Sequence, residues 1–358
     1  MKKNVFLWVA VFAVGAMSSC SVDKVVDQAE ARYIGFDPFA NKVTRGLDAT
    51  AFGYSNFDVW GKYDAINVFA RKMVSWQDGS PSGSWTYQPL VPWVDGKIYE
   101  FAAIAPTQPE GVTYAYNYSS NLTTDSGPLD GTYSITGIEI TQSNQTDYLT
   151  ATPVKVVCNT ASTSPVSFDF NHILSKIDFK FQPKTTSADN THWLSDVKID
   201  IKSITLSSVA TNKDYAVGVW GTAITADGRF SVTLTNNNST TYEPSSSAPD
   251  KVSKLTDKFS WLVVPQSETD AVDRKLTITF DVWTKDAAGA YNVQVLTDES
   301  ATIDIDTQWN PNTVYTYTVY IGSDILGPNA YITFDVNSAN WGNTSSNNDL
   351  NVPTSPAP

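Results

Sequence analysis

Few side chains of this chain could do covalent chemistry, and the most informative of them is Cys20. It ends the segment Met17-Ser18-Ser19-Cys20, which follows the basic pair Lys2-Lys3 and an apolar run over residues 5–17. Because a helix needs about 20 apolar residues to span a bilayer, residues 1–19 predict an export signal instead. A cysteine at this place is typical of a lipoprotein, in which the thiol is acylated and becomes the first residue of the mature chain. The alternative is a signal peptide with an incidental cysteine.

A second processing signal follows at Arg45-Gly46, where a basic residue precedes glycine. Cleavage after Arg45 would make residues 20–45 a removable propeptide. Arg32 is a rival position, although a cut there would leave the following apolar segment attached. The alternative is that Arg45 lies in an ordinary loop and is never cut.

The sequence offers few residues that could carry out acid–base catalysis or bind a metal ion. The chain has two histidines, and His172 lies in an apolar context that favours a packed, hydrogen-bonded core residue, while His192 lies in a polar loop. No Cys/His spacing suits zinc, and no nucleophile elbow or phosphate-binding loop is present. We therefore expect no enzyme, no cofactor and no metal, although a glycosidase could use any two of the 37 acidic residues.

Charge and cysteine content limit the partners further. The formal net charge is −13, and loss of Lys2 and Lys3 with the leader makes it −15. This balance argues against nucleic-acid binding, which requires clustered cations, and suits a surface that stays soluble outside the cell. If Cys20 is acylated, Cys158 has no partner for an intrachain disulfide and is expected to be a small buried side chain.

Apolar and polar residues alternate in short runs along most of the chain. Residues 176–181, 230–234, 276–282 and 315–321 each place their apolar side chains on one face of a strand. In residues 197–206 the alternation slips by one after Ser203, which predicts a β-bulge. Gly, Pro, Asn and Ser clusters separate the runs, so the fold class is all-β, with antiparallel β-sandwiches.

Two polar segments divide the chain. The run at residues 159–165 separates an N-terminal domain, residues 46–162, from a C-terminal domain, residues 163–327. Beyond a Gly-Pro break comes a closing segment, residues 328–358. It contains one further alternating run with Ile332, Phe334 and Val336. This run is expected either to serve a neighbouring molecule or to complete the core of its own subunit.

Five segments resemble a known family. Asp147-Tyr148-Leu149-Thr150-Ala151 and Phe170-Asn171-His172-Ile173-Leu174-Ser175-Lys176-Ile177 are similar to two successive motifs of the Bacteroidales fimbrillins, the subunits of type V pili. Phe259 to Gln266, ending in Pro-Gln, and Trp309 to Tyr317 resemble its later strands. The run from Ile332 to Trp341 resembles its closing segment. The five occur in the expected order, whereas residues 46–146 match only in general character.

The resemblance implies two transthyretin-like Greek-key sandwiches and a subunit that polymerises with other pilin subunits by strand exchange. An outer-membrane lipoprotein, anchored through Cys20, would be cut by an arginine-specific protease after Arg45. The strand within residues 31–39 would then leave its groove and be replaced by a neighbour's closing strand. Ile34 and Phe36 would point into the core, and Pro38 would mark the end of the leaving strand. Ile332, Phe334 and Val336 would form the donor strand. Alternatively, residues 31–39 are a permanent first strand.

A surface lipoprotein that binds glycans is the competing interpretation. Exposed aromatic side chains can stack on sugar rings, and several gather in a turn-rich region: Trp76, Trp85, Trp93, Tyr87 and Tyr99. The simpler alternative is that these large side chains supply core area in a protein without disulfides. For the pilin as well as for the glycan-binding lipoprotein, a host protein or a glycan is a further expected partner.

Overall fold

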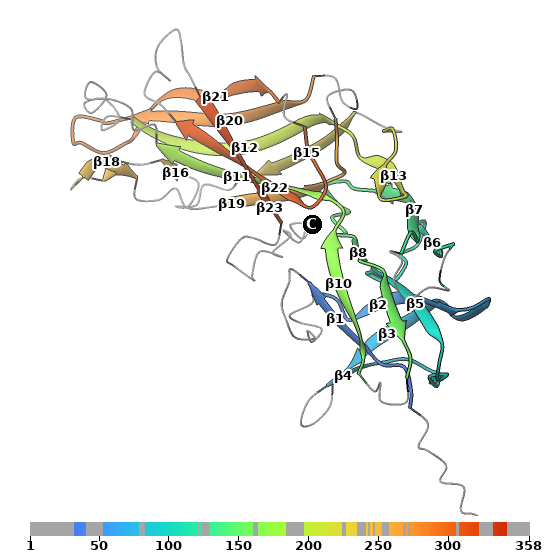
Figure 1. Cartoon of the computed structure of the whole chain (residues 1–358). Helices are drawn as coiled ribbons and strands as arrows, with labels where there is room; N and C mark the ends of the chain where they lie inside the picture. Colours follow the sequence, from blue (N-terminus) through green and yellow to red (C-terminus); the bar gives the residue numbers. More distant parts are fainter. Residues whose placement is uncertain are drawn as a thin grey trace, which may run out of the picture.

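A computed structural model of the chain describes residues 32–40, 53–78, 83–120, 122, 129–159, 164–183, 197–223, 227–234, 241–242, 244–245, 248–252, 258–267, 270, 273–305, 308–321 and 332–341. Every regular element in these ranges is a β-strand, so the predicted all-β class is confirmed. Figure 1 shows the strands in two groups, with β10 in the first leading into β11 in the second.

The first ten strands along the chain are β1 (Phe36–Ala40), β2 (Asn56–Tyr63), β3 (Ile66–Gln77), β4 (Ser84–Thr86), β5 (Ile98–Ala105), β6 (Thr113–Asn117), β7 (Thr132–Glu139), β8 (Leu149–Ala151), β9 (Val154–Val157) and β10 (Val166–His172). Those that follow are β11 (Ser175–Pro183), β12 (Val197–Val209), β13 (Asn212–Ala216), β14 (Val219–Trp220), β15 (Gly228–Thr233), β16 (Thr241–Tyr242), β17 (Pro244–Ser245), β18 (Ala248–Val252), β19 (Lys258–Val263), β20 (Lys275–Thr284), β21 (Val293–Asp304), β22 (Thr313–Ile321) and β23 (Ile332–Asn340).

The N-terminal group is an eight-stranded sheet in the order β1-β10-β8-β5-β2-β3-β4, with β9 also paired to β5. Its central strand β5 is buried on both faces. Phe101 and Ala103 belong to one hydrophobic core, whereas Ala102 and Ile104 belong to the other. Strand side chains alternate between faces, so this one strand joins the two cores of the protein.

The C-terminal group is a sandwich of two sheets. β19-β11-β22-β23 forms one layer and β15-β12-β20-β21 the other. Phe179 of β11 and Trp261 of β19 are buried in the same core as Phe230 of β15, whose ring centroid lies 5.8 Å from that of Trp261. The pairing of β12 with β20 shifts between Ile201 and Ser203, which confirms the predicted bulge one residue earlier than the alternation indicated.

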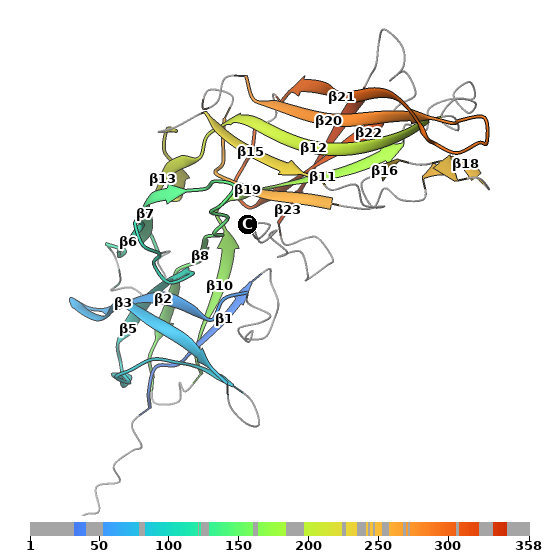
Figure 2. The ribbon, with the colours of Figure 1, turned by 180° about the vertical axis from the view of Figure 1, so that it is seen from behind.

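The sheets cross the division that the sequence predicted at residues 162 and 163. β10 follows that division, yet it pairs with β1 and β8 in the N-terminal sheet. A small sheet in the order β14-β13-β7-β6 takes strands from both sides, and both views show β13 beside β7 (Figures 1 and 2). The change from N-terminal to C-terminal sheets therefore falls between His172 and Ser175 rather than in the polar run at 159–165.

Candidate functional site

β1 is the edge strand of the eight-stranded sheet. It pairs in parallel with β10 along its whole length. The residues before it are also tied down, because the Ile34 N–H donates to the Val91 carbonyl at 2.9 Å and the Trp93 N–H donates to the Arg32 carbonyl at 2.8 Å. The first described segment of the chain is thus hydrogen-bonded to the protein on both of its sides.

The side chains of this segment fill part of the N-terminal core. Ile34 is 1% exposed and Phe36 is 3% exposed. The Phe36 ring lies 5.5 to 6.0 Å, centroid to centroid, from four other rings: Phe69, Tyr87, Phe101 and Phe168. The Tyr87 hydroxyl donates to the Ile34 carbonyl at 2.8 Å, and burial raises the pKa of Tyr87. Loss of residues 34–40 would therefore open an apolar slot along β10.

Pro38 does not mark the end of this strand. The strand continues to Ala40, and Pro38 is buried opposite Phe168 of β10. A proline has no N–H to donate, so it is tolerated in a sheet mainly where one side of the strand has no hydrogen-bonding neighbour. The edge position of β1 supplies that condition, which the sequence pattern alone did not reveal.

Arg32, the rival cleavage position, is held by several contacts. Its guanidinium pairs with the Asp95 carboxylate and donates to the Asn159 carbonyl at 2.8 Å, while its own carbonyl accepts from Trp93. Cys158 lies beside this cluster and is 1% exposed, as expected for a small buried side chain. Burial and the nearby Asp95 raise the pKa of its thiol. These contacts would hinder a protease at Arg32.

The other predicted processing residues lie outside the described residues. They are Cys20, Arg45 and Gly46, together with the export signal over residues 1–19. Lipidation and cleavage at these positions stay predictions.

The closing run forms β23, an edge strand of the C-terminal sandwich. It pairs antiparallel with β22, from Ile332 opposite Ile321 to Asn340 opposite Thr313. At Ile332, Phe334 and Val336 the structure describes the backbone alone. In the uncut chain this run completes a sheet of its own subunit, so it is free for a neighbour only after it separates from β22.

A three-residue cluster anchors the end of β23, and we call it the C-terminal latch: Trp341, His172 and Asp147. The Trp341 and His172 rings are stacked, with centroids 3.9 Å apart and planes at 6°. His172 Nδ1 lies 2.6 Å from Asp147 Oδ2, and the Trp341 N–H donates to the Asn312 carbonyl at 2.9 Å. His172 is 5% exposed, so its predicted role as a packed core histidine is confirmed. The latch joins three of the motifs that resemble fimbrillins.

The two edge strands share a sequence pattern. Residues 34–38 read Ile-Gly-Phe-Asp-Pro, and residues 332–336 read Ile-Thr-Phe-Asp-Val. Both follow Ile-x-Phe-Asp, with apolar residues at every second position. Sequence reasoning missed this match because a five-residue similarity carries no weight until both segments are known to be edge strands of sheets.

The aromatic residues proposed as a glycan platform mostly belong to the core. Tyr87, Trp93 and Tyr99 are each less than 10% exposed. Trp76 and Trp85 are half-buried and meet edge to face at 5.4 Å, so they do not form a flat surface. The core interpretation holds for the first three residues, and the pair that is partly exposed lacks the geometry of a stacking platform.

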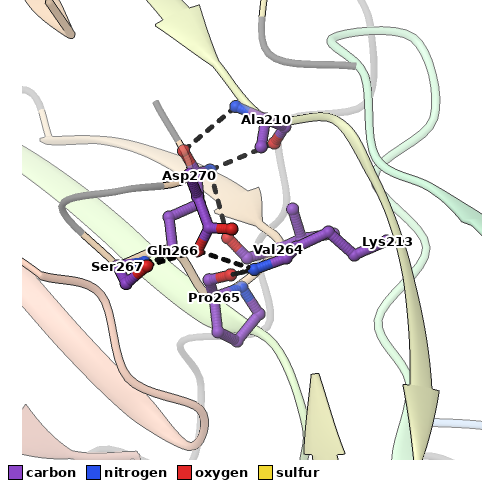
Figure 3. Close-up of polar contacts among 7 residues, drawn as sticks. All are labelled: Ala210, Lys213, Val264, Pro265, Gln266, Ser267 and Asp270. Carbon is purple, nitrogen blue, oxygen red and sulfur yellow. Dashed lines mark hydrogen bonds and ion pairs between the residues drawn. The ribbon is translucent and has the colours of Figure 1, made fainter. Parts of the chain in front are cut away.

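A cleft of about 630 Å³, which sequence reasoning also missed, lies in the C-terminal half. It is bounded by the β13–β14 hairpin, by the segment after β19 and by residues 308–311 before β22. Figure 3 shows the ion pair at its wall, where Lys213 Nζ donates to Asp270 Oδ2 and to the Pro265 carbonyl, both at 2.9 Å. Burial opposes ionisation of Asp270, but hydrogen bonds from Lys213 and Ser267 prevail and lower its pKa.

The floor of this cleft is fixed by Gln266, which is 1% exposed. Its side-chain amide accepts from the Ala210 N–H and donates to the carbonyls of Ala210 and Val264, at 3.0 to 3.1 Å (Figure 3). Its backbone exchanges two hydrogen bonds of 2.9 Å with Trp309. Gln266 and Trp309 come from two different fimbrillin-like motifs, so these motifs are parts of one rigid structural feature.

Within the described ranges, no group of three or more His, Cys, Asp or Glu side chains is arranged to hold a metal ion. The same part of the chain contains no helix that is long and apolar enough to cross a membrane.

These features define an all-β protein of paired sheets with a strand at each end of the described chain lying on a sheet edge. A family model described as "Fimbrillin-like" matches residues 55–341, and the chain belongs to this family. Fimbrillins are structural proteins, which agrees with the expectation that the chain is not an enzyme. A search of curated proteins gave no match.

Solved structures show the same fold. A fimbrial protein from Bacteroides vulgatus ATCC 8482 has 17% identity and a TM-score of 0.59, over 87% of this chain and 99% of that one. A candidate cell adhesion protein from Bacteroides ovatus ATCC 8483 has 17% identity and a TM-score of 0.50, over 87% and 98% of the two chains. At these identities the two structures show a shared fold, and the fimbrial role of this chain rests on the family match.

Proposed function

We propose that this protein is a pilin subunit that polymerises by strand exchange after cleavage at Arg45. The observation that carries the proposal is the pattern Ile-x-Phe-Asp, present at residues 34–37, where the chain enters the first strand, and at residues 332–335 in the last strand. A donor strand must present the same alternation as the strand that it replaces, because the slot is lined by fixed apolar side chains. The two transthyretin-like domains stay part of this proposal.

The acceptor site would be the place that β1 occupies. Without β1, the edge of β10 has unpaired backbone groups, and Phe168 and its neighbouring rings lose the cover that Phe36 provides. Such an edge binds any extended segment of matching alternation. Cleavage after Arg45 breaks the covalent connection from β1 to β2 and so makes β1 replaceable.

The donor would enter in the direction and register of β1. In this arrangement Ile332 takes the place of Ile34, and Phe334 takes the place of Phe36 among four aromatic rings. Val336 follows at the position of Pro38. Before it can donate, β23 must separate from β22, with which it pairs in the uncut chain.

Export as an outer-membrane lipoprotein fits the same proposal. Acylation of Cys20 would hold each subunit at the membrane until an arginine-specific protease releases it from its propeptide. Mass spectrometry of the membrane fraction should find acyl chains on Cys20, and an unmodified N-terminal peptide there would contradict this step.

Phe334→Asp tests the exchange directly. The change should abolish polymer growth after cleavage, because it would bring an unpaired carboxylate into an apolar slot. The matched control is Thr333→Asp, which places the same charge at the adjacent, oppositely facing position of the strand. Polymer length is measured by electrophoresis without heating after limited arginine-specific proteolysis. Equal polymerisation of the two variants would show that this face of β23 does not enter a groove.

A further inference from the structure

We propose that the cleft beside the β13–β14 hairpin binds an uncharged carbohydrate. This goes beyond the proposed function by giving the subunit an adhesive ligand of a named class, and it does not depend on strand exchange. The site is the one bounded by the hairpin, the segment after β19 and residues 308–311. Its volume, about 630 Å³, lies within the usual range for small-molecule sites, about 300–1,000 Å³.

An immobilised indole forms one wall of this cleft. Trp220 is half-buried, its Nε1–H donates to the Ile173 carbonyl at 2.9 Å, and its ring packs against Tyr215 with centroids 5.4 Å apart. A ring that is already held in place loses little conformational freedom when a ligand packs on it. Aromatic walls with a few polar groups are the usual composition of small-ligand sites, and the C–H faces of a sugar ring suit such a wall.

The hairpin tip next to Trp220 is strained and exposes apolar side chains. Val217 and Gly218 have φ angles of 55° and 75°, as a two-residue type I′ turn requires. A β-branched residue in this region is a genuine outlier, and such strain tends to be kept at functional sites. Val217 is 66% exposed and Val219 is 64% exposed, and Val219 lines the cleft. The turn thus places an apolar surface beside the indole.

Three residues on the rim of the cleft are polar and uncharged. Thr222, Gln308 and Asn310 are exposed, and their side chains make no hydrogen bond to another described residue. A hydroxyl and two amides supply both donors and acceptors, which match the hydroxyl groups of a sugar.

Charge within the cleft is internally balanced. Among its described lining residues the charged ones are Lys213 and Asp270, and these two are paired at 2.9 Å. The whole chain carries a net charge of −13, which disfavours anionic ligands at long range. An uncharged sugar therefore fits this site better than a sialylated or sulfated one.

The test uses the uncut full chain in a detergent without a sugar headgroup. Lactose, N-acetyllactosamine and cellobiose serve as probes, with sialyllactose as the anionic comparison, and binding is followed by saturation-transfer NMR and calorimetry. The double variant Gln308→Ala/Asn310→Ala should weaken binding about tenfold or more without lowering the melting temperature, because both side chains are exposed. Trp220→Ala should abolish binding, and Trp76→Ala, which removes a half-buried indole elsewhere, should leave it unchanged.

Three results would overturn the proposal. The first is that none of the neutral probes binds, and the second is that sialyllactose binds more tightly than lactose. The third concerns the variant Thr222→Cys, whose new thiol can be labelled with a thiol reagent. If polymerisation protects this thiol from the reagent and excess sugar does not restore labelling, the cleft is occupied by a neighbouring subunit. Phe334→Asp should bind sugar normally, so failure of strand exchange and failure of sugar binding are separate outcomes.

Discussion

At the scale of single residues, ionisable groups are buried beside specific partners. Glu100 is fully buried and accepts hydrogen bonds from the Tyr116 hydroxyl at 2.6 Å and from the Ser119 N–H. Lys213 is 3% exposed and pairs with Asp270. A buried charge that loses its partner is strongly destabilising, because neither water nor a counter-charge then compensates it.

Asp270→Asn should therefore destabilise the protein by about 3 kcal/mol, since it leaves the Lys213 ammonium buried without a counter-charge. The measurement is denaturant unfolding at neutral pH. Adding Lys213→Met should recover much of the loss, because the second change removes the unpaired charge. Equal stability of Asp270→Asn and the parent would show that this ion pair contributes nothing.

The same pair predicts an acid dependence. The folded-state pKa of Asp270 is lowered, so its contribution is present above the unfolded value near 3.8 and is lost as the pH falls through the lower folded value. Between about pH 6 and pH 2, the parent should lose more free energy of unfolding than Asp270→Asn. Parallel acid profiles would contradict this part of the argument.

At the scale of elements, the two edge strands are held differently. β1 is held by parallel pairing and by the burial of Ile34 and Phe36 in the N-terminal core. β23 is held by antiparallel pairing with β22 and, at its end, by the C-terminal latch. In the proposed exchange both strands must leave their places, and a single substitution in the latch should change how firmly β23 is held.

Trp341→Ala should weaken the latch and so have two opposite effects. It should destabilise the uncut monomer by about 3 kcal/mol, as expected for truncation of a buried tryptophan. It should also speed polymerisation after cleavage, because β23 separates from β22 more easily. Trp341→Phe, which keeps a ring over His172, is the control. Its stability and its polymerisation rate should lie between those of the parent and those of Trp341→Ala. A destabilised monomer that polymerises more slowly would show that Trp341 acts in the polymer instead.

At the scale of the whole molecule, the proposed cleavage and strand release would be separate steps. A cut at Arg45 removes the covalent link to β2, but it leaves the hydrogen bonds of residues 32–40 and the buried side chains of Ile34 and Phe36. The burial of these apolar side chains contributes roughly 25 cal/mol per Å², so the cut fragment should stay bound until a donor displaces it.

Native mass spectrometry of the protein cut at low concentration should therefore detect the fragment ending at Arg45 still in complex with the body. A synthetic peptide of residues 332–341 should displace it, and the same peptide with Phe334→Asp should not. Phe36→Ala in the fragment should speed its release, because it removes the ring that packs among four others. Immediate loss of the fragment on cleavage would contradict this two-step order.

The sequence by itself determined the features that depend on local order along the chain. Alternation predicted the β-strands, the slip near Ser203 predicted the bulge, and the apolar context of His172 predicted a buried histidine. These predictions follow from the two-residue period of a β-strand, which is visible within a short segment of the sequence.

Only the tertiary structure decided which strands share a sheet, because pairing depends on contacts between distant segments. It placed β10 in the N-terminal sheet despite the polar run before it, and it allowed Pro38 inside β1 by putting that strand at an edge. It paired β23 with its own subunit, and it brought together Trp220, Gln266 and Asn310 around one cleft. No local sequence pattern predicts which residues far apart in the chain come into contact, so the cleft and the latch could be identified only in the folded structure.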